Sequence, residues 1–222
     1  MPHPSKPVPV DIVSDVVCPW CVIGNHQLAA ASRETGVPID VRWHPFELNP
    51  NMADEGENLR DHLAAKYGTT LQNSIKSRAR LTELGADLGF EFNYADDMRM
   101  YNTFRAHQLI DWAGAQGNAH ETNLALFGAF FTHRRDVSDI EVLCDVAASV
   151  GLGRDEANAM LQSGERADTV REKERHWTNR GVSGVPTMIF GQRFATSGAQ
   201  GVENFSDALL RVSQAATAES NE

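Results

Sequence analysis

The chain has 222 residues, of which 41% are hydrophobic and 23% charged, and its formal net charge is -10. This composition can support a large apolar core, which excludes a disordered chain. An acidic chain without a basic cluster is unsuited to the phosphate backbone of nucleic acids, and no apolar run reaches the length of a membrane span. Since the first residues also lack an apolar run of signal-peptide length, we expect a cytoplasmic protein.

The first part of the chain predicts a tail, a strand and a helix. Three prolines in residues 1–7 disfavour regular structure, so we expect a flexible tail there. A β-branched run over residues 10–17 predicts a buried strand, and residues 27–31 favour helix. Thr35-Gly36-Val37-Pro38 then combines a glycine suited to a C-terminal cap with a proline, which predicts the end of that helix.

The next segment predicts a second strand. Residues 39–46 alternate in polarity, with Ile39, Val41 and Trp43 on one side, which is the period of a strand. The helix between the two strands is long enough for a crossover connection. The two strands should therefore be parallel neighbours in one sheet.

A helical pattern begins after Asn49-Pro50-Asn51 and continues to residue 165. Apolar side chains recur three or four positions apart in six segments, which are residues 59–67, 71–85, 100–114, 119–133, 140–150 and 156–161. Ser138-Asp139-Ile140-Glu141 matches a capping box at the start of the fifth segment. We therefore predict an all-helical block over residues 51–165.

The last part of the chain returns to a mixed pattern. Gly191-Gln192 predicts the turn of an antiparallel hairpin. One helix is predicted before this hairpin in the sequence and one after it. The four predicted elements are a helix over residues 166–180, strands over residues 185–190 and 193–196, and a helix over residues 202–216.

Cys18-Pro19-Trp20-Cys21 stands at the junction of the first strand and the first helix. The free N–H groups of the first helical turn and the helix dipole favour the thiolate form of Cys18. Cys21 lies one turn further along the same face, close enough to form a disulfide with Cys18, and Pro19 suits the first helical position because it lacks an N–H. The motif therefore predicts a redox pair in which Cys18 attacks and Cys21 resolves.

The alternative for a C-x-x-C motif is half of a zinc site. Such a site needs a second pair of ligands, and Cys144, the third cysteine, stands alone in an apolar helical pattern. We therefore expect no metal, and a buried, unreactive Cys144. His120-Glu121 does not complete a zinc-protease motif either, because Leu124 occupies the position of the second histidine.

Four motifs follow one another along the chain, at residues 15–24 (DVVCPWCVIG), 43–50 (WHPFELNP), 102–107 (NTFRAH) and 184–187 (GVPT). In this order they resemble the thioredoxin superfamily, and within it the DsbA-like branch and its FrnE-type subfamily. The resemblance implies an α/β thioredoxin fold with a large all-helical insertion.

The same resemblance implies a division of the chain. A discontinuous thioredoxin-like domain would comprise residues 8–50 and 166–216, and the helical domain over residues 51–165 would be inserted into it. Residues 1–7 and 217–222 are expected to be flexible tails.

The resemblance also implies a substrate-binding segment. The Val185-Pro186 bond is expected to be cis and to lie against the cysteines, so that Gly184, Val185 and Pro186 present backbone groups to a substrate. The alternative is a proline that merely starts a strand. In the active-site loop, Pro19 and Trp20 are expected to tune the redox balance, and Trp20 is either a substrate contact or a packing residue.

Three further residues are candidates for supporting roles. Glu47, at the end of the second strand, could relay a proton to or from Cys21, and the alternative is a surface carboxylate. Asn102 and His107 match the subfamily motif and are candidates for lining the cleft over Cys18, although a capping or core role is favoured for His107. His26 is expected to face solvent.

These features predict a protein-disulfide oxidoreductase or isomerase that works by thiol–disulfide exchange. The direction depends on reduction potentials and stays open. Partners would be protein or small-molecule thiols and disulfides, and neither nucleic acid nor membrane, with a homodimer left open. No cofactor is expected beyond the cysteine pair, with glutathione open as a thiol co-substrate.

Two other functions stay open. Kappa-class glutathione transferases and 2-hydroxychromene-2-carboxylate isomerases share the implied architecture, but those relatives carry serine at the position of Cys18, so the intact pair favours redox chemistry. The other alternative is a chaperone that holds clients in the cleft between the two domains. Replacing Cys18 with serine would separate the three functions.

Overall fold

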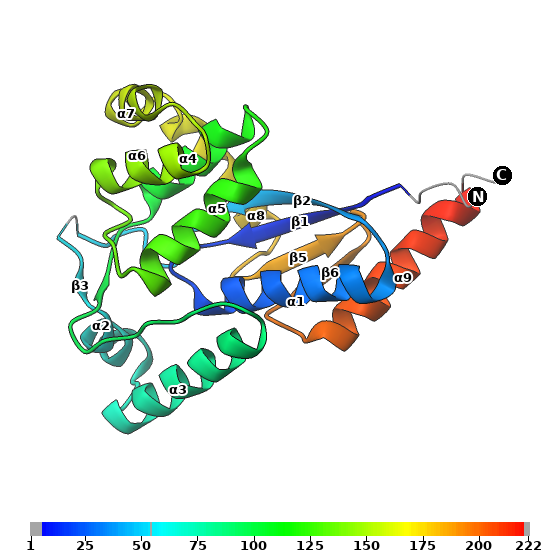
Figure 1. The fold of residues 1–222 in the computed structure, drawn as a ribbon, viewed down its shortest axis with the longest axis horizontal. Helices are drawn as coiled ribbons and strands as arrows, with labels where there is room; N and C mark the ends of the chain where they lie inside the picture. The colour runs from blue at the N-terminus through cyan, green and yellow to red at the C-terminus, as the bar shows by residue number, and fades with distance from the viewer. Residues whose placement is uncertain (1–5, 54, 220–222) are drawn as a thin grey trace.

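The fold is described from a computed structural model in which residues 6–53 and 55–219 are placed (Figure 1). Four strands, from both ends of the chain, form the central sheet: β1 (Val8–Ser14), β2 (Ile39–Pro45), β5 (Thr187–Phe190) and β6 (Phe194–Ser197). Their order across the sheet is β2-β1-β5-β6. The β1 strand is central, which explains why it is buried and rich in β-branched residues.

The predicted β-α-β unit is confirmed. Between β1 and β2 runs α1 (Pro19–Thr35), which ends at Gly36 in the left-handed conformation with a φ of 67°. The two strands are parallel, with Val8 opposite Ile39 and Ser14 opposite Pro45. As a result, the carboxyl ends of both strands point toward the start of α1.

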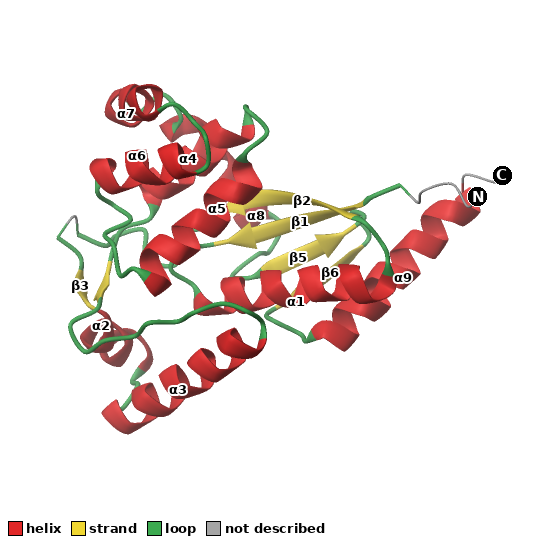
Figure 2. Cartoon of the chain, in the orientation of Figure 1, coloured by secondary structure: helices red, strands yellow, loops and turns green. Residues whose placement is uncertain are grey.

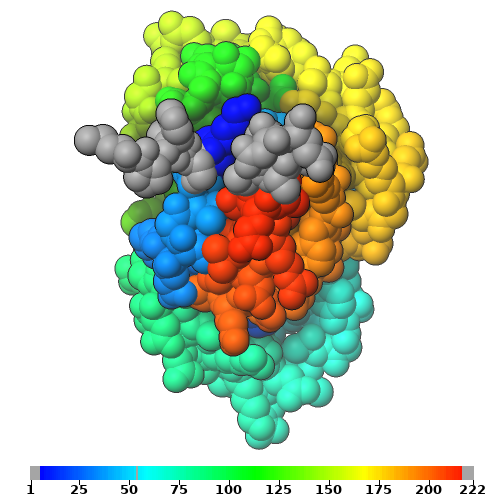
Figure 3. Space-filling model, turned by 90° about the vertical axis from the view of Figure 1, so that its right-hand side faces the viewer, coloured from blue at the N-terminus to red at the C-terminus, as the bar shows by residue number. Residues whose placement is uncertain are grey.

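The predicted hairpin is confirmed as well. β5 pairs antiparallel with β1 on one side and with β6 on the other. The last helix, α9 (Val202–Glu219), packs against α1, and both lie in front of the sheet in Figure 1, whereas α8 (Ala167–Asn179) lies behind it, next to β2. Figure 3 shows α9 on the surface, with inserted helices above and below it.

Helices predominate between β2 and α8 (Figure 2), as predicted. They form two groups, with α2 and α3 below the sheet in the view of Figure 1 and α4 to α7 above it. Buried apolar side chains of the sheet and of these helices join one continuous cluster. The bounds are α2 (Leu59–Tyr67), α3 (Leu71–Asp87), α4 (Phe104–Gly114), α5 (Ala119–Phe127), α6 (Ile140–Ser149) and α7 (Arg154–Ser163).

The prediction of an all-helical insertion is wrong in one place. Two short strands, β3 (Glu57–Asn58) and β4 (Arg99–Met100), pair antiparallel. The helix predicted from residue 100 therefore begins only at Phe104, because Met100 is held extended opposite Glu57.

Two other local predictions need correction. The helix predicted over residues 119–133 changes at its end into a π-helix, Gly128–Thr132. The capping box is also wrong, since Asp139, and not Ser138, caps α6 by accepting a hydrogen bond from the Glu141 N–H at 2.9 Å.

The predicted tails lie mostly outside the described residues, which exclude 1–5 and 220–222. The α9 helix continues to Glu219 and so includes the first three residues of the predicted C-terminal tail. The domain boundaries at residues 50 and 165 stay predictions. Within the described ranges, no helix is both long and apolar enough to cross a bilayer.

Candidate active site

Cys18 lies where the chain passes from β1 into α1, as predicted. It is the N-cap residue of α1, with φ -92° and ψ 112°, and Pro19 is the first residue of the helix. The Cys18 N–H donates to the Asp15 carbonyl oxygen at 3.1 Å, and the Cys21 N–H donates to the Cys18 carbonyl oxygen at 3.0 Å. These bonds fix the turn and place the Cys18 sulfur at the positive end of the helix dipole.

The segment before β5 reaches Cys18 from 167 positions along the chain. Cys18 Sγ lies 3.7 Å from the Val185 carbonyl oxygen, and the Val185–Pro186 bond is cis, as the resemblance implied. The Thr187 hydroxyl donates to the Gly184 carbonyl oxygen at 2.8 Å and holds the approach to the strand. The three predicted substrate-binding residues thus belong to the segment beside Cys18, and their role in binding stays a prediction.

Cys21 differs from Cys18 in its surroundings. Both are free thiols, and Cys21 is fully buried. Burial raises the pKa of Cys21 well above its ordinary value, and the hydrogen bond and charge of Cys18 raise it further. The Ser14 side chain and the Asp15 backbone act in the opposite direction. A buried thiol that ionises reluctantly is poorly suited to the first attack on a substrate.

One aromatic side chain belongs to the motif, and a second, from the insertion, interacts electrostatically with Cys18. Trp20 is 39% exposed, as a contact surface for a substrate requires. Tyr94 follows α3 in the insertion, and burial raises its pKa, the Arg78 charge lowers it, and the Cys18 charge raises it. Tyr94 is therefore within electrostatic reach of Cys18. Sequence reasoning missed Tyr94, because no local pattern connects it with the cysteines.

Glu47 is not the surface carboxylate of the alternative interpretation, since only 2% of its side chain is exposed. Arg171 of α8 donates hydrogen bonds to both Glu47 and Glu174. Burial and the charge of Glu174 raise the pKa of Glu47, whereas the charges of Arg171 and His107 lower it. Cys21 is not one of these partners, so a proton relay between Glu47 and Cys21 stays a prediction.

His107 is a core residue, as its favoured interpretation predicted. It is buried, and its Nε2 donates to the Phe46 carbonyl oxygen at 3.2 Å and lies 3.5 Å from Asp15 Oδ1. Burial lowers the pKa of His107, but the hydrogen bond and charge of Asp15, with the charges of Glu174 and Glu47, outweigh burial and raise it. A protonated His107 is thus paired inside the protein.

Asn102 fixes the start of α4. Its Oδ1 accepts a hydrogen bond from the Phe104 N–H at 2.9 Å, and its Nδ2 donates to the Met52 carbonyl oxygen at 3.4 Å. Asn102 therefore ties α4 to the segment that follows β2. A place in the cleft over Cys18 stays a prediction.

The other residues considered in the sequence analysis are Cys144, His26 and any metal ligands. Cys144 is buried in α6, as expected. His26 does not simply face solvent, because its ring packs edge-on against Phe90 with the ring centres 5.5 Å apart, and burial lowers its pKa. In the part of the chain that is described, no group of three or more His, Cys, Asp or Glu side chains could hold a metal ion.

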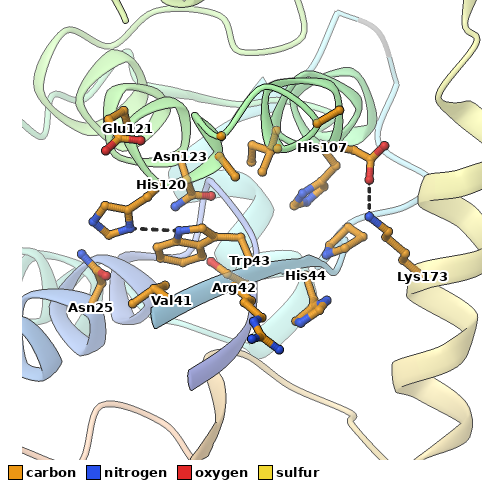
Figure 4. A pocket seen from close by; sticks show the side chains of 18 of the residues that line it. Asn25, Val41, Arg42, Trp43, His44, His107, His120, Glu121, Asn123 and Lys173 are labelled. Carbon is orange, nitrogen blue, oxygen red and sulfur yellow. Dashed lines mark hydrogen bonds and ion pairs between the residues drawn. The ribbon is translucent and has the colours of Figure 1, made fainter. Parts of the chain in front are cut away.

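A cavity of about 810 Å³ lies beside β2, bordered by α1, α4, α5 and α8 (Figure 4). The Trp43 indole N–H donates to His120 Nδ1 across it at 3.2 Å. Ser14 and His107 belong to its lining, but neither Cys18 nor Cys21 does. The sequence predicted a cleft between the two domains, but not the residues that line this cavity.

Comparison with known proteins places this geometry in a family. The sequence profile described as "DSBA-like thioredoxin domain" matches residues 9–210. The uncharacterized protein YwbO of Bacillus subtilis (strain 168) is 29% identical over 203 residues, which are 91% of this chain and 96% of YwbO. A crystal structure of a probable DsbA oxidoreductase from Streptomyces coelicolor is 30% identical, with a TM-score of 0.85, over 92% of this chain and 89% of that one. The predicted fold class is confirmed.

The structure of a 2-hydroxychromene-2-carboxylate isomerase is also similar, with a TM-score of 0.70 and 18% identity over 94% of this chain and 98% of that one. At this identity the likeness concerns the fold alone. The fold therefore does not separate redox chemistry from isomerisation, and the residues of the site must do so.

Proposed function

The chain belongs to the family of DSBA-like thioredoxin domains, and from this we propose that it is a thiol–disulfide oxidoreductase acting through Cys18 and Cys21. The observation that carries the proposal is the position of Cys18 Sγ, at the start of a 17-residue helix and 3.7 Å from the Val185 carbonyl oxygen. The helix start directs its free N–H groups toward the sulfur, and the backbone beside it offers hydrogen bonds to an extended substrate.

In the proposed reaction the Cys18 thiolate attacks one sulfur of a substrate disulfide. A bond forms between the two sulfurs, and the other substrate sulfur leaves as a thiolate. Cys21 then loses its proton and attacks Cys18 Sγ, which forms the Cys18–Cys21 disulfide and releases the second substrate sulfur. Two electrons pass to the substrate, and the reverse sequence would oxidise a dithiol. The raised pKa of Cys21 makes its deprotonation the demanding part of the second step.

The finer assignment is part of the same proposal. The four motifs support membership of the FrnE-type subfamily. A cytoplasmic location and glutathione as a thiol co-substrate stay proposals. Protein disulfides are the substrates we favour, because Trp20 is exposed beside the cysteines and offers them an apolar contact. The intact pair supports redox chemistry over the glutathione-dependent isomerase or transferase, whose members resemble this chain but carry serine in place of Cys18.

The reduction of insulin by dithiothreitol tests the proposal. We expect the wild-type protein to accelerate precipitation of the insulin B chain, and Cys18→Ser to leave only the rate of dithiothreitol alone. Cys21→Ser should accumulate a mixed disulfide with the substrate, detectable by mass spectrometry. Cys144→Ser is the matched control and should keep full activity, because Cys144 is buried in α6, outside the site.

Two outcomes would contradict the proposal. Equal acceleration by wild type and Cys18→Ser would show that the cysteine pair is not the catalyst. No acceleration by either, with client holding or glutathione conjugation in its place, would favour one of the two alternatives.

A further inference from the structure

The β2 strand is an edge of the sheet, with β1 on one side and no strand on the other. Two backbone hydrogen bonds show which residues of β2 direct their N–H and C=O groups toward β1. The Val8 N–H donates to the Pro38 carbonyl oxygen at 2.8 Å, and the Phe46 N–H donates to the Ser14 carbonyl oxygen at 3.1 Å. In a parallel pair this pattern assigns the even-numbered residues of β2 to the ladder with β1.

The odd-numbered residues of β2 consequently point their backbone groups away from the sheet. The N–H and C=O groups of Ile39, Val41 and Trp43 alternate along this free edge. Within residues 6–53 and 55–219, no hydrogen bond to these outward groups is present. Such a row of groups is a template for an added strand.

The cavity of about 810 Å³ lies along this edge and is lined by every residue of β2 (Figure 4). Both α5 and α8 pack against β2, in front of the sheet and behind it in Figure 1, so the edge is recessed between them. Gly114 and Ala115, at the end of α4, also line this space, and neither carries a large side chain. We call this space the β2 trough.

Most charged side chains of the β2 trough pair with one another. Arg42 contacts Asp40 at 2.9 Å, and Asp111 forms ion pairs with both Arg166 and Lys173. A strongly charged ligand would have to compete with these pairs. The trough therefore favours a ligand whose polar groups are neutral.

The unmet hydrogen-bonding groups of the trough match the chemistry of a peptide. They include the outward N–H and C=O groups of β2 and Nδ2 of Asn123, a residue only 1% exposed that has no partner for this amide among the described residues. Neutral amides supply both donors and acceptors at the spacing of a strand.

We propose that the β2 trough binds an extended segment of a client polypeptide, which adds to the sheet as a strand beside β2. The outward groups from Ile39 to Trp43 span about 13 Å, so a segment of about five residues suffices. A second copy of this chain cannot pair its own β2 edge with this one, because that edge is recessed between the same helices. The proposal is independent of thiol chemistry and holds equally for Cys18→Ser.

Amide hydrogen exchange of the full-length, ¹⁵N-labelled protein tests the proposal. The probe is a pool of acetylated and amidated hexapeptides of mixed sequence, at millimolar concentration. We expect exchange of the outward amides of Ile39, Val41 and Trp43 to slow by about tenfold or more with the pool. The inward amides at residues 40, 42 and 44 are bonded to β1 in either case and serve as the internal control.

Unchanged exchange at the three outward amides would overturn the proposal. Slowing confined to residues around Val185 would also overturn it, because the peptides would then bind beside the cysteines. Measurement on Cys18→Ser separates this result from any failure of the redox function.

Val41→Pro provides a second, independent test. Proline removes the outward N–H without removing a bond to β1, which an edge strand tolerates. We expect peptide binding to weaken about five- to tenfold, the value of one backbone hydrogen bond, and to change by less than about twofold in Val41→Thr, which keeps the N–H. Equal binding by Val41→Pro and wild type would overturn the proposal, and if Val41→Pro does not fold, the exchange experiment decides.

Discussion

The protonation of His107 depends on its partner Asp15. Burial lowers the pKa of His107, but Asp15, Glu174 and Glu47 together raise it. A histidine whose pKa in the folded state exceeds its value in the unfolded chain, about 6.5, adds stability below that pH, and this stability is lost as pH rises through the folded-state pKa. We therefore expect His107→Gln to cost more free energy of unfolding at about pH 6 than at about pH 8.5, in urea denaturation.

Asp15→Asn is the matched background for this measurement. The amide keeps an oxygen for the Leu48 N–H, which bonds Asp15 Oδ2 at 2.7 Å, but it removes the negative charge. In that background the additional cost of His107→Gln at the lower pH should shrink, because only the charges of Glu174 and Glu47 remain to oppose the effect of burial. An equal cost at both pH values in the otherwise wild-type protein would contradict the assigned protonation.

Single residues were predictable where their neighbours in the sequence determine their surroundings. Cys18 and Cys21 follow a strand and open a helix, so their places at the start of α1 could be derived locally. The burial of Glu47 could not, because its partner Arg171 lies 124 positions away and faces it only once α8 has packed behind the sheet. Tyr94 was missed for the same reason.

Among the helices, α3 makes an unusually close approach to the loop that follows it. A Cβ on Gly85 would lie 2.7 Å from the Phe90 carbonyl oxygen and 2.5 Å from Phe92 Cδ2. Alanine favours helix by about 1 kcal/mol over glycine, but overpacking costs about 1–3 kcal/mol, and here a backbone atom must move. We expect Gly85→Ala to lower the free energy of unfolding in urea by about 1 kcal/mol.

Gly128→Ala is the control for this prediction. A Cβ at this position meets no other atom within 4 Å, so the substitution should stabilise the protein by up to about 1 kcal/mol. If Gly85→Ala stabilised the protein to the same degree, the prediction would be wrong, because the loop after α3 could then move away from the added Cβ at no cost in stability.

Whole elements were predictable to the extent that each carries its own periodic pattern. The predicted range 59–67 coincides with α2, and the strands and the hairpin of the sheet were found in the same way. β3 and β4 have two residues each, too few to show a period, and their pairing joins residues far apart in the sequence. The β2 trough likewise arises only from how several helices pack around one strand.

At the scale of the whole molecule, one arginine connects three parts of the fold. Arg171 belongs to α8, donates to Glu47 after β2, and places its guanidinium 3.7 Å from the centre of the Phe104 ring at the start of α4. It also pairs with Glu174 at 2.8 Å. The segment after β2, the insertion and α8 therefore meet at Arg171, through two ion pairs and one cation–π contact. The buried Glu47 carboxylate depends on the charge of Arg171.

Replacing Arg171 with methionine keeps much of the side-chain volume but leaves the Glu47 carboxylate without this cation. Loss of one partner of a fully buried pair costs about 3–5 kcal/mol, and because 38% of the Arg171 side chain is exposed, solvent screening reduces the expected cost to about 1–3 kcal/mol. Urea denaturation measures the loss. Arg154→Met is the matched control, because Arg154 pairs with exposed carboxylates on the surface and its removal should leave stability unchanged.

The cost of Arg171→Met should also depend on pH. Burial and the charge of Glu174 already raise the pKa of Glu47, and without Arg171 this pKa rises further. A carboxyl whose pKa is higher in the folded than in the unfolded state favours folding at low pH and opposes it as pH rises through the folded-state value. The loss should therefore be smaller at about pH 5 than at about pH 7.5, since a protonated Glu47 needs no cation. An equal loss at both pH values would mean that Arg171 stabilises the protein through its packing on Phe104, and that the charge of Glu47 contributes nothing to the junction of the three parts.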